Sequence, residues 1–153
     1  MFALVGGVSR VQGQSVDLQS ATASEILDTV AQNDAQVTVV NMWATWCVPC
    51  IEEFPHFMKF GEEFADQGVE VVFVSTDVPS EKDAARDFLV EQGVTGLSFL
   101  KAGKTTPFVN TFHEAWTGAV PATFLYNADG QLLEFWEGKM SYDALERKVM
   151  AYF

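Results

Sequence analysis

The sequence has few cysteines, few basic residues and no long apolar run, and each of these shortages excludes a class of protein. Its two cysteines are too few for the disulfide scaffold of a small secreted domain, although they suffice for one reversible bridge. The 9 basic residues are outnumbered by 21 acidic ones, so the net charge of −12 disfavours nucleic acid and anionic membranes as partners. No apolar run approaches the ~18 residues of a membrane-spanning helix. We therefore expect no nucleic-acid partner and no transmembrane span in this chain.

Histidine is scarce as well, with only His56 and His113 present. A zinc site built on the two cysteines needs a third and a fourth ligand, and His56 is the only histidine near them in the sequence. We therefore expect no metal site. A metal-binding protein remains the less favoured alternative.

The abundance of apolar residues indicates one folded domain. The 153 residues are 48% hydrophobic and 13% aromatic, which is enough to build a substantial core. We assign residues 20–153 to this domain and residues 1–19 to an N-terminal extension with a candidate short strand at 16–18. The apolar start at residues 1–8 is compatible with the remnant of an export signal or anchor, and equally with a packed end of the domain.

Both cysteines lie in the stretch W-A-T-W-C-V-P-C, residues 43–50, with the spacing C-x-x-C. A β-branched run at 37–40 precedes the stretch and predicts a buried strand over 36–42. Residues 47–63 are typical of a helix that begins at or just before Cys47. A C-x-x-C pair between a strand and a helix is the arrangement of a redox site.

The start of a helix explains how such a pair can exchange disulfides. Unpaired backbone N–H groups and the positive end of the helix dipole favour an anion there. We therefore expect the pKa of Cys47 to fall from ~8.5 into the range ~3.5 to ~7.5. Cys50 lies three residues on, on the same face of the helix, and can attack a mixed disulfide held on Cys47. The sequence thus predicts a two-step exchange device whose redox-active disulfide, Cys47–Cys50, replaces any cofactor.

The rest of the chain alternates between helical and strand patterns. We expect helices at about 20–32, 81–92, 106–116 and 141–152, and strands at 69–76, 97–100, 120–126 and 131–137. The last two strands are joined by a hairpin turn at 127–130. This order predicts an α/β fold in which helices flank a central mixed β-sheet.

The motif W-x-x-W-C-x-P-C, together with V-P-A-T-F at 120–124, resembles the thioredoxin superfamily. Three further features are similar to the extracytoplasmic TlpA/ResA-like reductases: E-F-P at 53–55, a long β-α stretch at about 77–119, and the N-A-D-G turn at 127–130. The resemblance runs from about Gln36 to the C-terminus. It implies a thioredoxin fold with a TlpA-like central β-α insert.

The resemblance also implies roles for individual residues. Cys47 matches the exposed attacking thiol of the family, and Cys50 matches its buried resolving thiol. Pro121 matches the cis-proline beside the disulfide, which lets the backbone at Val120 pair with a substrate strand. Glu53 matches a glutamate that lies near the thiols and adjusts their proton affinity. These residues, apart from Val120, are the expected catalytic residues.

Trp46, Val48 and Pro49 join Val120 as expected substrate-binding residues. One position departs from thioredoxin itself, because Asn41 stands where thioredoxins carry a buried aspartate. An amide cannot accept a proton from the second cysteine. TlpA-like proteins commonly show asparagine there, so we expect Glu53 or water to take the role. The neighbouring Glu52 fits the other interpretation of such a carboxylate, an acid favoured near a helix start by the dipole.

The resemblance implies a thiol–disulfide oxidoreductase that reduces protein disulfides in the periplasm or another extracytoplasmic space. Cytochrome c maturation is one such task, and a membrane thiol carrier or a thioredoxin is the expected electron donor. A disulfide oxidase or isomerase stays open, because the reduction potential cannot be deduced from the two residues between the cysteines. A peroxidase is disfavoured, since no arginine lies near Cys47 in the sequence. A redox-inert binding module is the remaining alternative.

Overall fold

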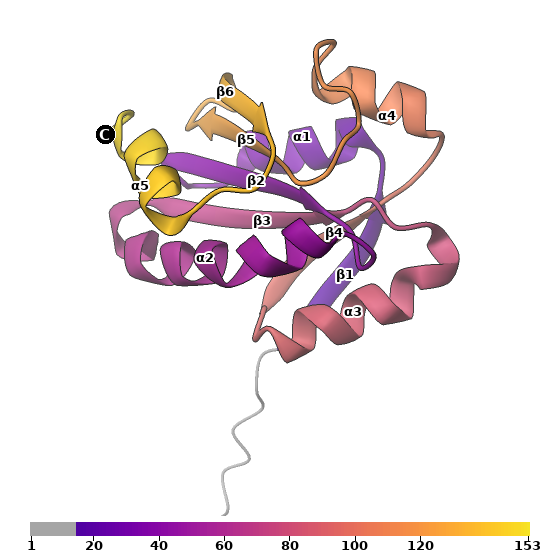
Figure 1. The fold of residues 1–153 in the computed structure, drawn as a ribbon. Helices are drawn as coiled ribbons and strands as arrows, with labels where there is room; N and C mark the ends of the chain where they lie inside the picture. Colours follow the sequence, from indigo (N-terminus) through magenta and orange to yellow (C-terminus); the bar gives the residue numbers. More distant parts are fainter. Residues whose placement is uncertain (1–14) are drawn as a thin grey trace, which may run out of the picture.

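The computed structural model describes residues 15–153, which form one six-stranded sheet covered by five α-helices (Figure 1). In chain order the elements are β1 (Val16–Ala21), α1 (Ala23–Gln32), β2 (Val37–Trp43), α2 (Val48–Phe64), β3 (Val69–Ser75), α3 (Lys82–Glu91), β4 (Gly96–Lys101), α4 (Thr105–Phe112), β5 (Ala122–Asn127), β6 (Leu132–Glu137) and α5 (Tyr142–Met150). Short 3-10 turns follow α2 at Ala65–Gln67 and precede α3 at Pro79–Glu81.

The sheet is mixed, as the sequence predicted. Its strand order is β1-β4-β3-β2-β5-β6. The first four strands in this order run parallel to one another, while β5 runs antiparallel to β2 and β6 antiparallel to β5. All seven residues of β2 are buried, which explains why the strand is mostly apolar in the sequence and does not alternate between apolar and polar residues. The C-x-x-C motif therefore emerges from the end of a central strand.

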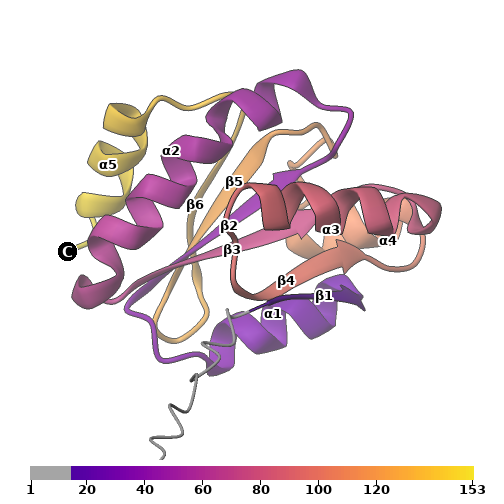
Figure 2. The same ribbon diagram turned by 90° about the horizontal axis from the view of Figure 1, so that it is seen from below.

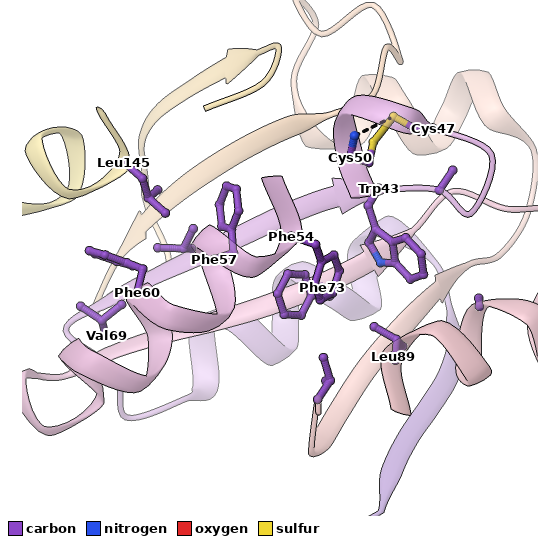
Figure 3. Close-up of a cluster of buried hydrophobic side chains, with 14 of the residues drawn as sticks. Trp43, Cys47, Cys50, Phe54, Phe57, Phe60, Val69, Phe73, Leu89 and Leu145 are labelled. Atoms are coloured by element: carbon purple, nitrogen blue, oxygen red, sulfur yellow. Dashed lines mark hydrogen bonds between the residues drawn. A yellow bond between two sulfur atoms is a disulfide. The ribbon is translucent and has the colours of Figure 1, made fainter. Parts of the chain in front are cut away.

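Two apolar cores lie on the two faces of the sheet. Helices α2, α3 and α5 cover one face, and α1 and α4 cover the other (Figure 2). On the α2 face, Phe54 stacks on Phe73 with ring centroids 4.1 Å apart and meets Trp43 edge-on at 5.5 Å (Figure 3). Trp43 is the last residue of β2, so this aromatic cluster packs directly behind the motif. The core thus anchors both the strand and the helix that carry the two cysteines.

Several predicted boundaries differ from the structure by a few residues, and two of these differences have a specific cause. The helix predicted to reach about residue 116 ends at Phe112, because His113 adopts an extended backbone and Trp116 turns its indole N–H to the carbonyl oxygen of Ala119 at 3.0 Å. The strand predicted from residue 120 begins at Ala122, because Pro121 has no N–H to donate to a neighbouring strand.

The predicted division between residues 19 and 20 falls inside β1, whose six residues all pair with β4. The candidate strand at 16–18 is therefore part of a longer strand of the main sheet, and the described part of the predicted extension belongs to the domain. The apolar start at residues 1–8 lies outside the described residues. The predicted insert at 77–119 contains α3, β4 and α4, and β4 lies between β1 and β3. Within residues 15–153, none of the helices combines the length and apolar character that crossing a membrane requires.

Candidate active site

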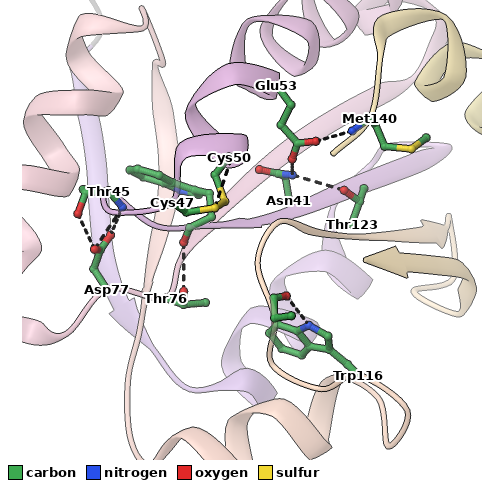
Figure 4. Close-up of a disulfide and its surroundings, with 12 residues drawn as sticks. Asn41, Thr45, Cys47, Cys50, Glu53, Thr76, Asp77, Trp116, Thr123 and Met140 are labelled. Atoms are coloured by element: carbon green, nitrogen blue, oxygen red, sulfur yellow. Dashed lines mark hydrogen bonds between the residues drawn. A yellow bond between two sulfur atoms is a disulfide. The ribbon is translucent and has the colours of Figure 1, made fainter. Parts of the chain in front are cut away.

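Cys47 and Cys50 form a disulfide at the junction of β2 and α2 (Figure 4). Their Cα atoms are 5.2 Å apart. Cys50 is fully buried, and Cys47 is 4% exposed, so solvent reaches Cys47 alone of the pair and over a small area. The attacking thiol expected at Cys47 is thus more accessible than its partner, although less exposed than the resemblance implied.

Cys47 also caps the helix that it precedes. Its backbone is extended, and its Sγ accepts a hydrogen bond from the Cys50 backbone N–H at 3.3 Å. Once the disulfide is reduced, a thiolate at this position faces the N–H groups of the first helical turn, and the helix dipole stabilises its charge. The local structure is therefore compatible with the nucleophile role expected for Cys47, which stays a prediction.

The peptide bond between Val120 and Pro121 is cis, which confirms the conformation implied by the family resemblance. Ala122 follows Pro121 and pairs with Met42 in β2, so the proline lies beside the end of β2 and close to the motif. The carbonyl oxygen of Pro121 accepts a hydrogen bond from the Gly138 N–H at 2.9 Å. Val120 is half-buried and precedes the paired part of β5.

Glu53 is fully buried one turn along α2 from Cys50. One carboxylate oxygen accepts a hydrogen bond from Asn41 Nδ2 at 3.1 Å, and the other accepts one from the Met140 backbone N–H at 2.9 Å (Figure 4). Burial raises the pKa of Glu53 to about 7, because the loss of hydration outweighs the two hydrogen bonds and the charge of Lys139, which all act in the opposite direction.

Asn41 holds this carboxyl group from β2. Its Nδ2 also lies 3.4 Å from Thr123 Oγ1 on β5, so one amide links the helix to two strands. The residue that departs from thioredoxin therefore contacts the glutamate that we expected to replace the aspartate. The neighbouring Glu52 is exposed and pairs with Lys139. It lies beyond the first turn of α2, where the helix dipole acts only weakly, so the dipole interpretation offered for it from the sequence is wrong.

The rim of the disulfide is apolar. Seven large hydrophobic residues are exposed in the described part of the chain, and three of them lie at this end of the sheet: Trp46 (69%) and Val78 (56%) in two connections, and Val48 (65%) at the start of α2. Pro49 is exposed beside Val48. Trp46, Val48 and Pro49 were expected from the sequence, whereas Val78 was not. This exposure is compatible with the substrate-binding role expected for Trp46, Val48 and Pro49, which stays a prediction.

Sequence reasoning also missed Asp77, a buried carboxylate just beyond β3. It accepts hydrogen bonds from the Thr45 backbone N–H at 3.0 Å and from Thr45 Oγ1 at 2.6 Å (Figure 4). It accepts a further hydrogen bond from Ser75 Oγ at 2.6 Å. The available signal was its position, since polar residues at the carboxyl ends of neighbouring parallel strands gather at one edge of the sheet.

No group of three or more histidine, cysteine, aspartate or glutamate residues within 15–153 is arranged to hold a metal ion. His56 Nδ1 lies 3.1 Å from the carbonyl oxygen of Met140 and donates to it in the tautomer that this contact requires. His113 Nδ1 accepts from the Ala115 N–H at 2.9 Å, and its ring packs on Phe135. Neither histidine is directed at the cysteines by these contacts.

The chain matches the AhpC/TSA family over residues 12–135. It is 28% identical to the thiol–disulfide oxidoreductase ResA of Oceanobacillus iheyensis, over 95% of this chain and 78% of that protein. It is 32% identical to ResA of Bacillus subtilis, over 67% of this chain but 53% of that protein. The chain therefore spans about half the length of the second relative.

Solved structures show the same architecture. StoA from Bacillus subtilis is 26% identical, with a TM-score of 0.60 over 77% of this chain and 85% of that one. A thiol:disulfide interchange protein from Chlorobium tepidum is 22% identical, with a TM-score of 0.64 over 85% of both chains, and at that identity it supports the fold alone.

Proposed function

This chain is a ResA-like member of the AhpC/TSA family, and from that premise we propose that it is a thiol–disulfide oxidoreductase that reduces disulfides in other proteins. One observation carries the proposal: Cys47 and Cys50 form a disulfide at the start of α2, one turn from the buried carboxyl group of Glu53. The exchange needs two thiols on one helix face and an anion-stabilising helix start, and both features are present.

The reaction transfers two electrons in two steps. In the dithiol form, the Cys47 thiolate attacks one sulfur of a substrate disulfide, which forms a mixed disulfide and releases the first substrate thiolate. The Cys50 thiolate then attacks Cys47 Sγ and releases the second substrate thiolate. The substrate gains two electrons, and the Cys47–Cys50 disulfide described above is the oxidised product. A further dithiol must then reduce this disulfide, and we propose a membrane thiol carrier or a thioredoxin as that donor.

Glu53 supports the second step. Cys50 is fully buried and must lose its proton before it can attack Cys47. A carboxyl group whose pKa is about 7 is partly ionised at neutral pH, so it can take up this proton and later return it. The hydrogen bonds from Asn41 and Met140 hold the carboxylate in a fixed orientation one turn from Cys50. We assign Glu53 to this proton-transfer role, in place of the aspartate of thioredoxins.

Substrate contacts follow from the surface around Cys47. We assign docking of apolar substrate side chains to Trp46, Val48 and Pro49, which are exposed beside the disulfide. The backbone at Val120, next to the cis-proline Pro121, is assigned to pairing with an extended substrate segment. The net charge of −12 favours basic partners. An extracytoplasmic location, with cytochrome c maturation as one task, completes the proposal.

The reduction potential tests the direction of electron flow. The protein is equilibrated with dithiothreitol or glutathione buffers, and the oxidised fraction is followed by the fluorescence of Trp43, which packs behind the disulfide, and of Trp46 beside it. A potential below about −200 mV is expected for a reductase, while a value near about −120 mV would assign the protein to disulfide donors. Cys47→Ser, which cannot form the disulfide, gives the fluorescence baseline.

A further inference from the structure

Asp77 occupies a position that the exchange chemistry does not explain. Its side chain is 1% exposed, and it carries no apolar surface that the core could use. A buried carboxylate is costly unless hydrogen bonds replace its hydration. Its donors come from two segments, because Thr45 lies in the connection between β2 and α2 and Ser75 ends β3. The charge is therefore satisfied only while these two segments lie in register.

The segment held in this way carries the reacting sulfur. Thr45 lies two residues before Cys47 and directly before Trp46, and it offers both its N–H and its hydroxyl to Asp77. A second contact joins the same parts of the chain, since the Thr76 N–H donates to the Trp43 carbonyl oxygen at 2.8 Å. Asp77 thus fixes the middle of the short connection between β2 and α2, while the backbone of Thr76, just beyond β3, binds the residue before that connection.

Two exposed apolar side chains flank this contact. Trp46 follows Thr45 and is 69% exposed, and Val78 follows Asp77 and is 56% exposed. They belong to different connections, β2–α2 and β3–α3, so nothing in the local sequence sets their relative position. The hydrogen bonds between Thr45 and Asp77 fix the backbone positions from which these two side chains extend, because they join the residues immediately before Trp46 and Val78.

We propose that Asp77 is a positioning residue for protein substrates: by holding Thr45, it places Trp46 and Val78 as one apolar docking surface beside Cys47. The fitting partner is a protein segment with an apolar residue near its disulfide. This proposal rests on the exchange activity proposed above. A small disulfide needs only Cys47 Sγ, whereas a protein substrate also needs the docking surface. Loosening the contact must therefore affect the two kinds of substrate unequally.

The test compares Thr45→Val with Thr45→Ser. Valine keeps the shape of threonine but removes the hydroxyl that bonds Asp77, while serine keeps the hydroxyl. With dithiothreitol as reductant, Thr45→Val is expected to raise the KM for insulin disulfides about tenfold. Binding must then also hold the connection in its docking conformation, which costs about the free energy of one lost hydrogen bond to a charged group. The rate with a small aromatic disulfide should stay within about twofold, and Thr45→Ser should return the insulin KM towards that of the wild type. Thr29→Val, which removes a hydroxyl contact on α1, is the matched control and should change neither rate.

A second readout does not depend on activity. The ¹⁵N heteronuclear NOE of the Trp46 backbone amide reports its fast motion, and it should fall in Thr45→Val and not in Thr45→Ser. An unchanged NOE in Thr45→Val, or equal losses with insulin and the small disulfide, would overturn the role of Asp77. If the wild type reduces neither substrate, the proposed function fails, and the NOE comparison still decides whether Asp77 holds the connection.

Discussion

Glu53 and Met140 are 87 residues apart in the sequence, and the Met140 backbone N–H donates a 2.9 Å hydrogen bond to the Glu53 carboxylate. The carbonyl oxygen of Met140 lies 3.1 Å from His56 Nδ1 and accepts a hydrogen bond from it in the tautomer that this contact requires. Helix α2 therefore holds both polar groups of one backbone residue in the connection between β6 and α5. This connection contacts the carboxyl group directly and contributes to its burial.

The burial of Glu53 makes stability depend on pH. The unfolded chain releases this proton near pH 4.5 and the folded protein near pH 7, so stability falls as the pH rises across that interval. We expect Glu53→Gln, which carries no charge, to raise the free energy of unfolding of the oxidised protein by up to about 3 kcal/mol at pH 8 and by little at pH 4. Urea unfolding at both pH values measures the difference.

Glu52→Gln is the control for that prediction. Glu52 lies next to Glu53 on α2 but is exposed and paired with Lys139. An exposed pair contributes little, so its removal should change the free energy of unfolding by less than about 1 kcal/mol at either pH. A gain for Glu53→Gln that is the same at pH 4 and pH 8 would show that the carboxyl group does not titrate in this range.

The two cysteines should behave differently in an experiment that traps the mixed disulfide. Cys50→Ala removes the resolving thiol, so we expect a mixed disulfide between Cys47 and a protein substrate to accumulate, visible by non-reducing electrophoresis. Turnover of insulin should fall to the background rate of dithiothreitol. Cys47→Ala should form no such adduct, because Cys50 is fully buried. Equal trapping by both variants would contradict the assignment of Cys47 as the nucleophile.

Trp46 should contribute most of the apolar docking energy near the disulfide. It is 69% exposed, and truncating a large aromatic residue at the centre of an interface commonly costs more than 1 kcal/mol. We expect Trp46→Ala to raise the KM for insulin about tenfold and to leave the reduction potential close to the wild-type value. Val90→Ala is a control on α3, since Val90 is 59% exposed and lies outside the rim. An unchanged KM in Trp46→Ala would show that Trp46 does not contribute to substrate docking.

Gly130 in the hairpin turn should be irreplaceable for a reason that Gly103 does not share. Both have positive φ, +77° and +82°. A Cβ on Gly130 would lie 2.6 Å from Ala31 Cβ on α1 and 2.8 Å from its Cα, whereas a Cβ on Gly103 would meet no atom within 4 Å. Gly103→Ala should lower the free energy of unfolding by about 1–2 kcal/mol, because alanine is strained at this positive φ. Gly130→Ala should lower the free energy of unfolding by about 1–3 kcal/mol more than Gly103→Ala does, because the backbone of α1 must shift. Thermal unfolding of the two variants measures the difference. Equal losses of stability would show that α1 can shift away from the new Cβ at little energetic cost.

Much of the fold followed from local patterns in the sequence. The β-branched run before the motif and the N-A-D-G turn each depend on neighbours within a few residues, and the structure confirms the elements they predict. The family resemblance supplied the cis bond before Pro121, which no local propensity indicates. The end of α4 was wrong, because the contact between Trp116 and Ala119 replaces the last helical turn.

The sequence by itself thus determined the order of the elements and the position of the two cysteines at a helix start. Only the tertiary structure decided the surroundings that govern their chemistry. Glu53 and Glu52 are adjacent acids on one helix, and packing buries one against Met140 while leaving the other exposed. Asp77 meets Thr45 across 32 residues. Burial and hydrogen-bond partners of this kind depend on which distant segments the sheet brings together, and no local pattern encodes that contact.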